Sequence, residues 1–542
     1  MSTVAADRLD QVGERKTEGP GIARAAGAIS CGVFASRILG FVRDMLIAKF
    51  FGAGTMADAF FVAFRIPSTL RELFGEGALS ASFVPVFTET LNRKGKQEAW
   101  RLARATGSFL AAMLIVVSAA GIIAAPAIVW IMAPGFHVYP EKLSLTVFLT
   151  RITFPYILFV GIAALFMGIL NSLRRYTAPA FAPTMLNLAM IGSVLFLSPL
   201  LNPPITSLAI GVLLGGIGQM AIQIPDLRRE GGSLSLDFSW RDPALRRIGK
   251  LMLPGLMGLI ITQANFFIST FLASFLKEGS VSFLYYSFRL VQIPIGLVGV
   301  ALGTAILPFL SSSVARGSLD ELNRITIFAL RVSLFITIPI TFGMIIFRRA
   351  LVTVLFERGQ FTPSMSREVA ETLLYLSLGI CFYVGDRILV SAFYSLQDTR
   401  TPMVISAIAV GVDIFCSILL MGPFQVRGLA LATSLASLSH FTFLVTCLRK
   451  RVGRLGGGEL RLSIFKIILS AVPMALFCHF LVESFPPWEQ PRLLSRVVSL
   501  AGEMGAGGVA YLMLALFTGS EEAKYLVERF HKVFAQAGRR AR

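Results

Sequence analysis

Charge is scarce in this sequence. Only 15% of its 542 residues are charged, whereas 55% are hydrophobic and the mean hydropathy is +0.72. A soluble chain of this length needs more charge to cover its surface. Long apolar runs recur from about residue 25 to about residue 517, each close to the roughly 20 residues that cross a bilayer. The sequence therefore predicts an all-α protein that crosses a membrane many times.

Cysteine and histidine are also scarce, and their placement excludes several kinds of site. The five cysteines show no CxxC spacing and lie in apolar runs, so we interpret them as small buried apolar residues. The four histidines form no metal-ligand pattern, and we therefore expect no metal and no cofactor. His440 and His479 lie in apolar runs and are interpreted as interhelical hydrogen-bonding groups, with proton carriage as the alternative.

The sequence lacks a long polar segment between its apolar runs. The connections are no longer than about 25 residues, and none holds a catalytic set of carboxylates, histidines or metal ligands. A membrane-bound glycosyltransferase or phosphatase needs such a set in a loop that faces water. We therefore expect a transporter and not an enzyme.

The apolar runs predict fourteen membrane spans. An even number places both termini on the same side of the membrane. The expected spans cover residues 25–50, 56–88, 105–133, 144–170, 181–198, 206–225, 251–275, 282–310, 325–347, 368–394, 402–421, 428–448, 467–483 and 496–517.

Lysine and arginine are distributed unevenly between the two sides. The N-terminal arm, the even-numbered connections and the C-terminal tail hold 32 of the 50 basic residues, the opposite connections hold 8, and the spans hold 10. The positive-inside rule therefore places both termini in the cytoplasm. Because the excess charge lies in short loops, it reflects topology, and we expect no nucleic-acid partner. The connection over 348–367 carries four arginines on the opposite side, so it is either a tolerated exception or a sign of a miscounted span.

Two spans resemble each other, which indicates an internal repeat. "AFFVAFRIPSTLRELFGEGALSASFVP" and "SFLYYSFRLVQIPIGLVGVALGTAILP" both contain Phe-Arg, then Ile-Pro, then Ala-Leu followed by Pro. They lie about 223 residues apart, which corresponds to six spans, and an even number of spans preserves orientation. We expect two six-helix lobes in a parallel repeat, with a substrate site between the lobes near the membrane midplane.

This organisation divides the chain into six segments. The last two spans lie outside the repeat. The segments are a cytoplasmic arm (1–24), an N-terminal lobe (25–226), a cytoplasmic linker (227–250), a C-terminal lobe (251–450), the two last spans (451–517) and a cytoplasmic tail (518–542).

The first span carries charges that lipid rejects. Arg37, Arg43 and Asp44 lie in "ASRILGFVRDMLIAKFFGAG", and each charge at a span centre costs about 2.5–3.5 kcal/mol. We therefore expect these side chains to face protein or water. Gly40 lies between the two arginines, and a bend there brings both guanidinium groups to one cavity. Irregular helices at membrane depth are found where the backbone lines such a cavity.

The second span carries a polar stripe. Residues at helical spacing place it on one face: Asp58, Arg65, Thr69, Glu72 and Glu76. Arg71 lies beside this stripe, and Pro67 interrupts the helix. A span with so many charges is not expected to lie against lipid.

These charges allow two interpretations. In the first, they pair internally: Arg37 with Asp44, and Arg65 with Asp58 or Glu72. In the second, Arg37 and Arg43 act together with Arg289 of the eighth span to bind an anion. Guanidinium groups hold phosphate oxygens bidentately and stay charged when desolvated. The pyrophosphate of a lipid head group is the natural candidate.

A lone carboxylate lies in the eleventh span. Asp413 is the only charge in "ISAIAVGVDIFCSILL". An isolated ionisable residue in a span is functional by default. It is a candidate site for a proton or a sodium ion, together with Asn265 or Gln263 of the seventh span. The alternative is a neutral, protonated and hydrogen-bonded carboxyl group.

Several motifs resemble one known family. "SRILGFVRDMLIAKFFGAGTMADAFFVAFRIPSTLRELFGEGALSASFVPVF" is similar to the N-terminal signature of the MurJ/MviN family of bacterial lipid II flippases. "GILNSLRRYTAPAFAPTMLN", "LFERGQFT" and "FYSLQDTRTP" also resemble that family, which belongs to the multidrug/oligosaccharidyl-lipid/polysaccharide exporter superfamily. The resemblance covers roughly residues 25–450.

The resemblance implies a fold and an activity. It implies fourteen helices in two lobes around a cationic cavity that opens alternately to each side of the bacterial inner membrane. The substrate would be lipid II, an undecaprenyl-pyrophosphoryl-linked muropeptide, moved from the cytoplasmic to the periplasmic leaflet. The partners would be lipid II and membrane lipids, with other cell-wall synthesis proteins as further candidates. The alternatives are an exporter of another lipid-linked oligosaccharide and a cation-coupled drug exporter of the same superfamily.

The resemblance also implies roles for single residues. The substrate-binding arginines of the family fall on Arg37, Arg43 and Arg289. Other important positions of the family fall on Ser36, Asp44, Asp58, Arg71 and Glu76. We expect Arg65 to take part in gating, and Gly40, Pro67 and Pro294 to supply bends. The two last spans would form a groove for the lipid tail.

The energy source is left open by the resemblance. Asp413 matches an acidic position of a sodium site in some members, but the residue four before it is Ala409, where a polar ligand would help. This departure weakens the case for sodium. Coupling to the membrane potential is the preferred interpretation, with H⁺ or Na⁺ as alternatives.

Overall fold

Helices make up the regular structure of the part of the chain that the structure describes. The computed structural model describes residues 27, 29–75, 78–233, 235–237, 239, 242–453 and 456–528, and contains no strand within them. The prediction of an all-α fold is therefore confirmed. Glu76 lies outside the described residues, as do the side chains of Glu72 and Asn265.

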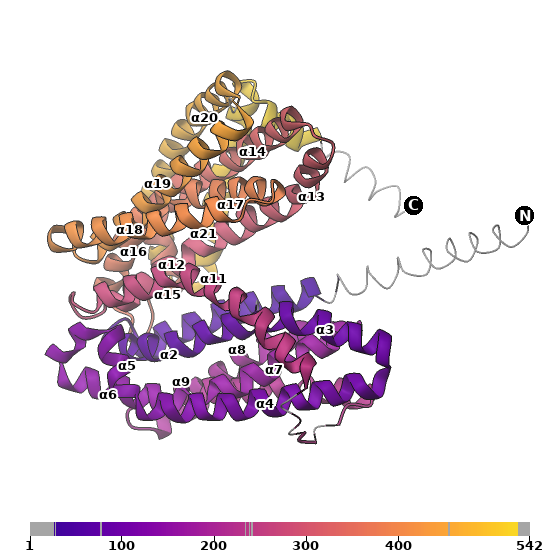
Figure 1. Ribbon diagram of the computed structural model, residues 1–542. Coiled ribbons are helices and arrows are strands. Elements are labelled where there is room, and N and C mark those ends of the chain that lie inside the picture. Colours follow the sequence, from indigo (N-terminus) through magenta and orange to yellow (C-terminus); the bar gives the residue numbers. More distant parts are fainter. Residues whose placement is uncertain are drawn as a thin grey trace, which may run out of the picture. The chain divides into compact units, whose positions relative to one another are not determined.

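The chain forms two compact units, Met1–Phe267 and Ile268–Arg542, which are described separately. The helices of the first unit are one over residues 29–51, α2 (Thr55–Gly75), α3 (Ala78–Lys94), α4 (Lys96–Ile123), α5 (Ala125–Met132), α6 (Pro140–Thr153), α7 (Tyr156–Ser172), α8 (Thr177–Leu197), α9 (Thr206–Ala221) and α10 (Ile224–Arg229) (Figure 1). The division between the units falls inside α11 (Pro243–Ala273). The division of the chain into six segments, with the boundaries expected from the sequence, stays a prediction.

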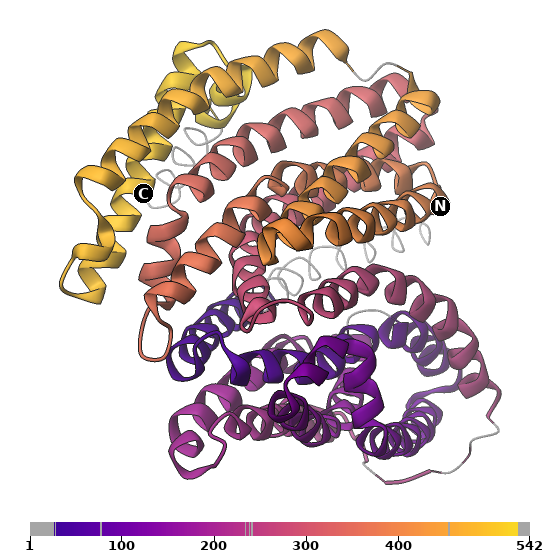
Figure 2. The ribbon, with the colours of Figure 1, turned by 90° about the vertical axis from the view of Figure 1, so that its left-hand side faces the viewer.

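The second unit contains twelve further elements in its described part. They are α12 (Ser280–Pro294), the π-helix η3 (Ile295–Val300), α13 (Ala301–Ala315), α14 (Leu319–Ile346), α15 (Arg348–Phe356), α16 (Pro363–Ser377), α17 (Ile380–Ser395), α18 (Arg400–Phe424), α19 (Val426–Val452), α20 (Gly457–Ser484), the 3₁₀ turn η4 (Pro487–Glu489) and α21 (Leu493–Phe517). A short helix over 521–528 follows them. Figure 2 shows α20 and α21, in orange to yellow, lying beside each other at the end of the chain.

The helices are long and apolar enough to make this a multi-pass membrane protein. Ten helical stretches in the described residues meet the length and composition that a span requires, and α16 with α17, bent by 42°, forms an eleventh. The predicted number of fourteen stays a prediction. The predicted spans 25–50, 56–88 and 251–275 include residues whose backbone or side chains the structure does not describe.

The internal arrangement of the two units supports the predicted repeat. In the first unit α2 contacts α6, α3 contacts α4 and α7, and α9 contacts α7 and α8. In the second unit α12 contacts α16, α13 contacts α14 and α17, and α19 contacts α17 and α18. Each contact in one unit therefore has its counterpart in the other, between α-helices whose numbers are higher by ten. In addition, α3 begins at Ala78 and α13 at Ala301, and each carries a proline, Pro85 or Pro308, at the same position.

Glycine permits the closest helix contacts within each unit. Gly211 and Gly215 lie four residues apart on α9, and an added Cβ would lie 2.9 Å from Met190 Cα and 2.8 Å from Leu186 Cα of α8. Such spacing of small residues lets helices approach closely where no hydrophobic effect drives them together. Gly428 has the same role in the other unit, because a Cβ there would lie 2.2 Å from the carbonyl oxygen of Leu420.

The basic connection over 348–367 is not a plain loop. Its first half is α15, whose buried face includes Ala350, Val352 and Phe356. Arg348 lies 3.7 Å from the carboxylate of Glu371, and the guanidinium of Arg349 lies 4.8 Å from the ring centre of Trp488. Arg358 donates to the carbonyl oxygen of Val354, so three of the four arginines have local partners. The side of the membrane on which this connection lies stays a prediction.

Candidate functional site

In the first unit, the best-defined charged group lies where the helix over 29–51 packs against α8. Asp44 Oδ1 accepts hydrogen bonds from Nε and Nη2 of Arg43, at 3.0 and 2.7 Å. Arg43 Nη1 donates to Asn187 Oδ1 at 3.1 Å. Asn187 Nδ2 donates in turn to the carbonyl oxygen of Ser36 at 3.0 Å. Arg43 and Asp44 are both buried, so this cation is held in place and neutralised within the unit.

Arg37 differs from Arg43 in its surroundings. Arg37 is exposed, and no carboxylate of the described residues lies within ion-pair distance of it. The helix continues without interruption through Gly40, which is buried. The internal partner expected for Arg37, Asp44, is instead held by the neighbouring Arg43. A role for Gly40 in bending stays a prediction.

A second buried ion pair lies at the start of α2. Lys142 Nζ of α6 lies 2.6 Å from Asp58 Oδ2, and both side chains are almost fully buried. The ammonium also lies 4.1 Å from the centre of the Phe136 ring. Lys142 lies in a predicted connection, and no role for it follows from the sequence pattern. Its signal was weak: it is the one basic residue in the predicted connection over 134–143.

Two arginines of α2, Arg65 and Arg71, are half-buried. Ser68 Oγ donates to the carbonyl oxygen of Arg65 at 2.8 Å. Pro67 lies inside α2, which continues to Gly75.

In the second unit, Arg289 lies on α12 and is half-buried. The helix is anchored to α16 by a hydrogen bond from Ser287 Oγ to the carbonyl oxygen of Val369, 3.0 Å long. Pro294 ends α12, and η3 begins at the next residue. The regular α-helical hydrogen-bond pattern changes at η3, and a bend at Pro294 stays a prediction.

Asp413 is buried in the middle of α18. Only 1% of its surface is exposed, and neither carboxylate oxygen has a hydrogen-bond partner among the described residues. Ala409 lies one turn before it and is also buried. A carboxyl group in such a place is neutral or binds a cation.

An apolar groove of 380 Å³ lies between α14, α20 and α21. Its walls include Phe335, Pro339 and Met344 of α14 and Gly508 of α21. An added Cβ at Gly508 would meet no atom within 4 Å, so this part of the groove is open. The last two helices thus line an apolar groove, and its role as the lipid-tail groove stays a prediction.

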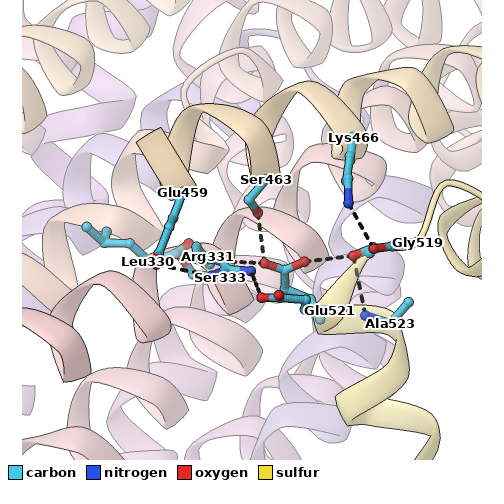
Figure 3. A network of polar contacts seen from close by, with 11 residues as sticks. Leu330, Arg331, Ser333, Glu459, Ser463, Lys466, Gly519, Glu521 and Ala523 are labelled. Atoms are coloured by element: carbon cyan, nitrogen blue, oxygen red, sulfur yellow. Dashed lines mark hydrogen bonds and ion pairs between the residues drawn. The ribbon is translucent and has the colours of Figure 1, made fainter. Parts of the chain in front are cut away.

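The short helix over 521–528 contributes Leu526 and Val527 to the wall of this groove. Figure 3 shows the polar network that holds this segment. Arg331 of α14 donates to Glu522 and to Glu521, both at 2.6 Å. Ser463 of α20 donates to Glu522 at 2.8 Å, and Lys466 Nζ donates to the carbonyl oxygen of Gly519 at 3.0 Å. This network was not predicted from the sequence, because its members lie up to 191 residues apart.

Comparisons with known proteins agree with these features. The family model described as "Lipid II flippase MurJ" matches residues 47–499, which include Arg289 and begin after Arg37 and Arg43. A relative from Vibrio cholerae serotype O1, named "Probable lipid II flippase MurJ", is 34% identical over 91% of this chain and 95% of its own length. A relative from Burkholderia cenocepacia, named "Lipid II flippase MurJ", is 34% identical over 88% of this chain and 94% of its own length.

Solved structures give the same result. The structure entitled "Lipid II flippase MurJ, inward closed conformation" has a TM-score of 0.75 and 25% identity, and the match covers 92% of this chain and 99% of the other. An inward-facing MATE family transporter has a TM-score of 0.62 at 12% identity, over 78% of this chain and 96% of the other, and therefore shares the fold alone. The chain belongs to the MurJ family, which is a family of flippases and not of enzymes, as its sequence predicted.

Proposed function

We propose that this protein moves lipid II from the cytoplasmic to the periplasmic leaflet of the bacterial inner membrane. The observation that carries the proposal is the match to the MurJ family over residues 47–499, with relatives that align along nearly the whole chain. An apolar groove in the second unit, and arginines within the helices of both units, suit a lipid with a charged head group.

The pyrophosphate of lipid II is held by Arg37, Arg43 and Arg289 in this proposal. Arg37 supports it, because this exposed guanidinium has no carboxylate partner in the described residues and can receive an anion without breaking an ion pair. Arg43 takes part when a phosphate oxygen replaces the Asp44 carboxylate as its hydrogen-bond acceptor. The replacement is possible because carboxylate and phosphate oxygens accept the same charge-assisted hydrogen bonds from a guanidinium. Arg289 belongs to the second unit, so for both units to take part in alternating access this arginine must bind the same pyrophosphate.

The prenyl tail occupies the groove between α14, α20 and α21. Its wall is apolar, and Gly508 leaves space that a large side chain would fill. Gly508→Trp is expected to reduce transport at least tenfold. Gly502→Trp is the matched control: Gly502 lies on the same helix, also has open space around it and does not line the groove. Equal rates of lipid II transport by Gly508→Trp and Gly502→Trp would contradict the claim that this groove holds the prenyl tail.

The membrane potential supplies the energy. Both termini lie in the cytoplasm in this proposal, because 32 of the 50 basic residues lie on that side of the predicted topology. A charge that crosses the membrane field gains about 2.3 kcal/mol per 100 mV. Asp413 is the candidate for a coupling cation, either H⁺ or Na⁺, and Ala409 gives Na⁺ no second ligand from the preceding turn.

A drug exporter of the same superfamily is the main rival, because such transporters share the fold. The two functions differ in the charge of their ligands. Binding of a lipid pyrophosphate to the purified protein, with no binding of lipophilic cations, supports the flippase. The opposite result supports the exporter.

Depletion of the protein from its host cell tests the proposed function. Lipid II is expected to accumulate, and the accumulated lipid II is expected to lie in the cytoplasmic leaflet, where an externally added enzyme does not reach it. Accumulation of another lipid-linked sugar would assign another substrate. Normal amounts and distribution of lipid II in depleted, growing cells would contradict the proposal.

A further inference from the structure

A histidine is hydrogen-bonded on both sides of its ring inside the second unit. His440 of α19 has Nδ1 2.9 Å from Asp386 Oδ2 of α17. Its other ring nitrogen, Nε2, lies 3.1 Å from Ser406 Oγ of α18. Three helices of one unit therefore meet at this imidazole. Asp386 is buried, and its other oxygen, Oδ1, has no hydrogen-bond partner among the described residues.

The surroundings of the imidazole accommodate both of its protonation states. Asp386 in its ionised form accepts only, so Nδ1 carries a proton in either state. In the neutral ring Nε2 accepts from the Ser406 hydroxyl, and in the protonated ring Nε2–H donates to the same oxygen, because a hydroxyl does both. The ring therefore gains or loses a proton with every hydrogen bond kept. The carboxylate of Asp386 balances the charge of the imidazolium.

A second buried carboxyl group, Asp413, lies on α18, two helical turns after Ser406. Ser406 and Asp413 are seven residues apart on α18, which corresponds to about 10 Å along the axis. His440 and Thr433 are seven residues apart on α19, which returns beside α18. The contact of Ser406 with His440 therefore brings Thr433 to the level of Asp413. Tyr383, one turn from Asp386 on α17, donates its hydroxyl to the carbonyl oxygen of Thr433 at 3.2 Å.

Titratable or charged groups lie on every helix that packs around His440. On α17 and α18 they are Cys381, Tyr383, Asp386, Arg387, Tyr394, Arg400, Asp413 and Cys416.

The other helices that contact α19 are α12, α14 and α16. They carry the charged residues Arg289, Asp320, Glu321, Arg324, Arg331, Arg367, Glu368 and Glu371. Histidine is the side chain that ordinarily changes charge between about pH 5 and 8, and His440 is the histidine of this assembly.

We propose that Asp386 and His440 form a proton-binding site that is loaded and unloaded in each transport cycle, and that Tyr383 and Asp413 continue the proton path through the second unit. The proposal rests on the proposed function, since it names the ion whose movement drives lipid transport. The proton binds at Nε2 of His440 and leaves from the same atom, and no bond other than N–H forms or breaks. The alternative is that the pair only joins α17 to α19.

The chain provides a matched control for this pair. His479 Nε2 lies 3.4 Å from Glu483 Oε1, but both side chains are largely exposed on α20. His440→Asn keeps a nitrogen donor near Asp386 and removes the titratable ring. His479→Asn makes the same chemical change at the exposed pair. Ser406→Ala removes the acceptor of the protonated ring and leaves His440 in place.

The experiment measures the initial rate of lipid II transport by the full-length protein in vesicles between about pH 5 and 8. The wild-type rate is expected to change about tenfold over this range, and His479→Asn is expected to keep that profile. His440→Asn is expected to change less than twofold over the range. Ser406→Ala is expected to shift the midpoint to lower pH, because both forms of the ring lose a hydrogen bond and the charged form loses the stronger one. A wild-type profile in His440→Asn, or a flat profile in the wild-type protein, overturns the proposal.

A second readout separates this inference from the proposed function. The sequence has only four histidines, so nitrogen NMR of histidine-labelled protein resolves His440, identified by its loss in His440→Asn. If this signal titrates between about pH 5 and 8 but the protein moves no lipid II, the proposed function is contradicted and the proton site is retained. Lipid II transport with a His440 signal that does not change over this range would keep the function and overturn the proton site.

Discussion

Asp44 Oδ1 accepts two hydrogen bonds from the guanidinium of Arg43, the residue directly before it in the chain. The arginine side chain is long enough to fold back on its neighbour, so the two residues form a buried, neutral pair. A neutral pair lowers the cost of placing Arg43 in a membrane span. It also means that an anion must compete with Asp44 for this arginine.

Asp44→Asn is expected to tighten the binding of lipid pyrophosphate and to slow transport. The amide keeps the shape of the side chain but no longer competes for Arg43 with a full charge. Hydrogen bonds to charged groups contribute about 1.5–3 kcal/mol, which corresponds to about a tenfold or larger change in Kd. The Kd of the purified protein for an undecaprenyl pyrophosphate checks this. Asp226→Asn, at a half-buried position in an ion pair with Arg229, is the control. Unchanged or weaker binding by Asp44→Asn would count against the exchange.

Lys142→Ala is expected to lower the free energy of unfolding by about 3–5 kcal/mol, because it leaves Asp58 buried without its ammonium partner. Thermal unfolding of the purified protein measures this change. The double variant Asp58→Asn with Lys142→Met removes both charges and is expected to recover part of the loss. A change under about 0.5 kcal/mol in Lys142→Ala, which is typical of surface substitutions, would show that the pair does not stabilise the fold.

Asp398 gives the loop between α17 and α18 a defined pH dependence. A hydrogen bond from the Thr401 hydroxyl, then one from its backbone N–H and the charge of Arg451, hold the pKa of Asp398 below its ordinary value of 3.8. The ionised form therefore stabilises the fold above pH 3.8, and this contribution is lost as the pH falls through the lowered pKa.

Asp398→Asn is accordingly expected to be less stable than the wild-type protein at pH 7, and the difference is expected to shrink in strongly acidic solution. Unfolding midpoints measured over the acidic and neutral range check this. A difference that stays constant across the range would show that the charge of Asp398 does not contribute.

Arg331→Gln is expected to release the helix over 521–528 from α14 and α20. Burial raises the pKa of Glu522, but hydrogen bonds from Ser520, from backbone and from Arg331 outweigh burial and hold this pKa below its ordinary value of 4.5. The loss of one charged partner is expected to raise amide hydrogen exchange over 518–528 about tenfold, since such bonds contribute about 1.5–3 kcal/mol. Lys524→Gln, on the same segment, is the control. Equal exchange in both variants would show that Arg331 does not hold the segment.

Much of the fold follows from local sequence patterns. Apolar runs at the length of a span predicted the helices, and the shared order of Phe-Arg, Ile-Pro and Ala-Leu predicted two units with the same helix contacts. These properties are local or repeat along the chain, so one sequence carries them. The number of spans is harder to predict, because charged residues in 25–50 and 56–88 obscure the hydropathy pattern.

The partners of the charged residues depend on the tertiary structure. Asp58 contacts Lys142, which lies 84 residues away, and Arg43 contacts Asn187, which lies 144 residues away. No spacing rule connects such residues. The pairing of Arg43 with the adjacent Asp44 was also not expected, because adjacent positions point to different sides of a helix and only the length of the arginine overcomes this.

The most direct test of the account is transport of fluorescent lipid II across vesicles that contain the purified protein and carry a membrane potential. The wild-type protein is expected to move lipid II between the leaflets, and Arg37→Ala and Arg289→Ala are expected to lose this transport at least tenfold while inserting and folding normally. Transport by either variant at the wild-type rate would contradict the claim that these arginines hold the pyrophosphate.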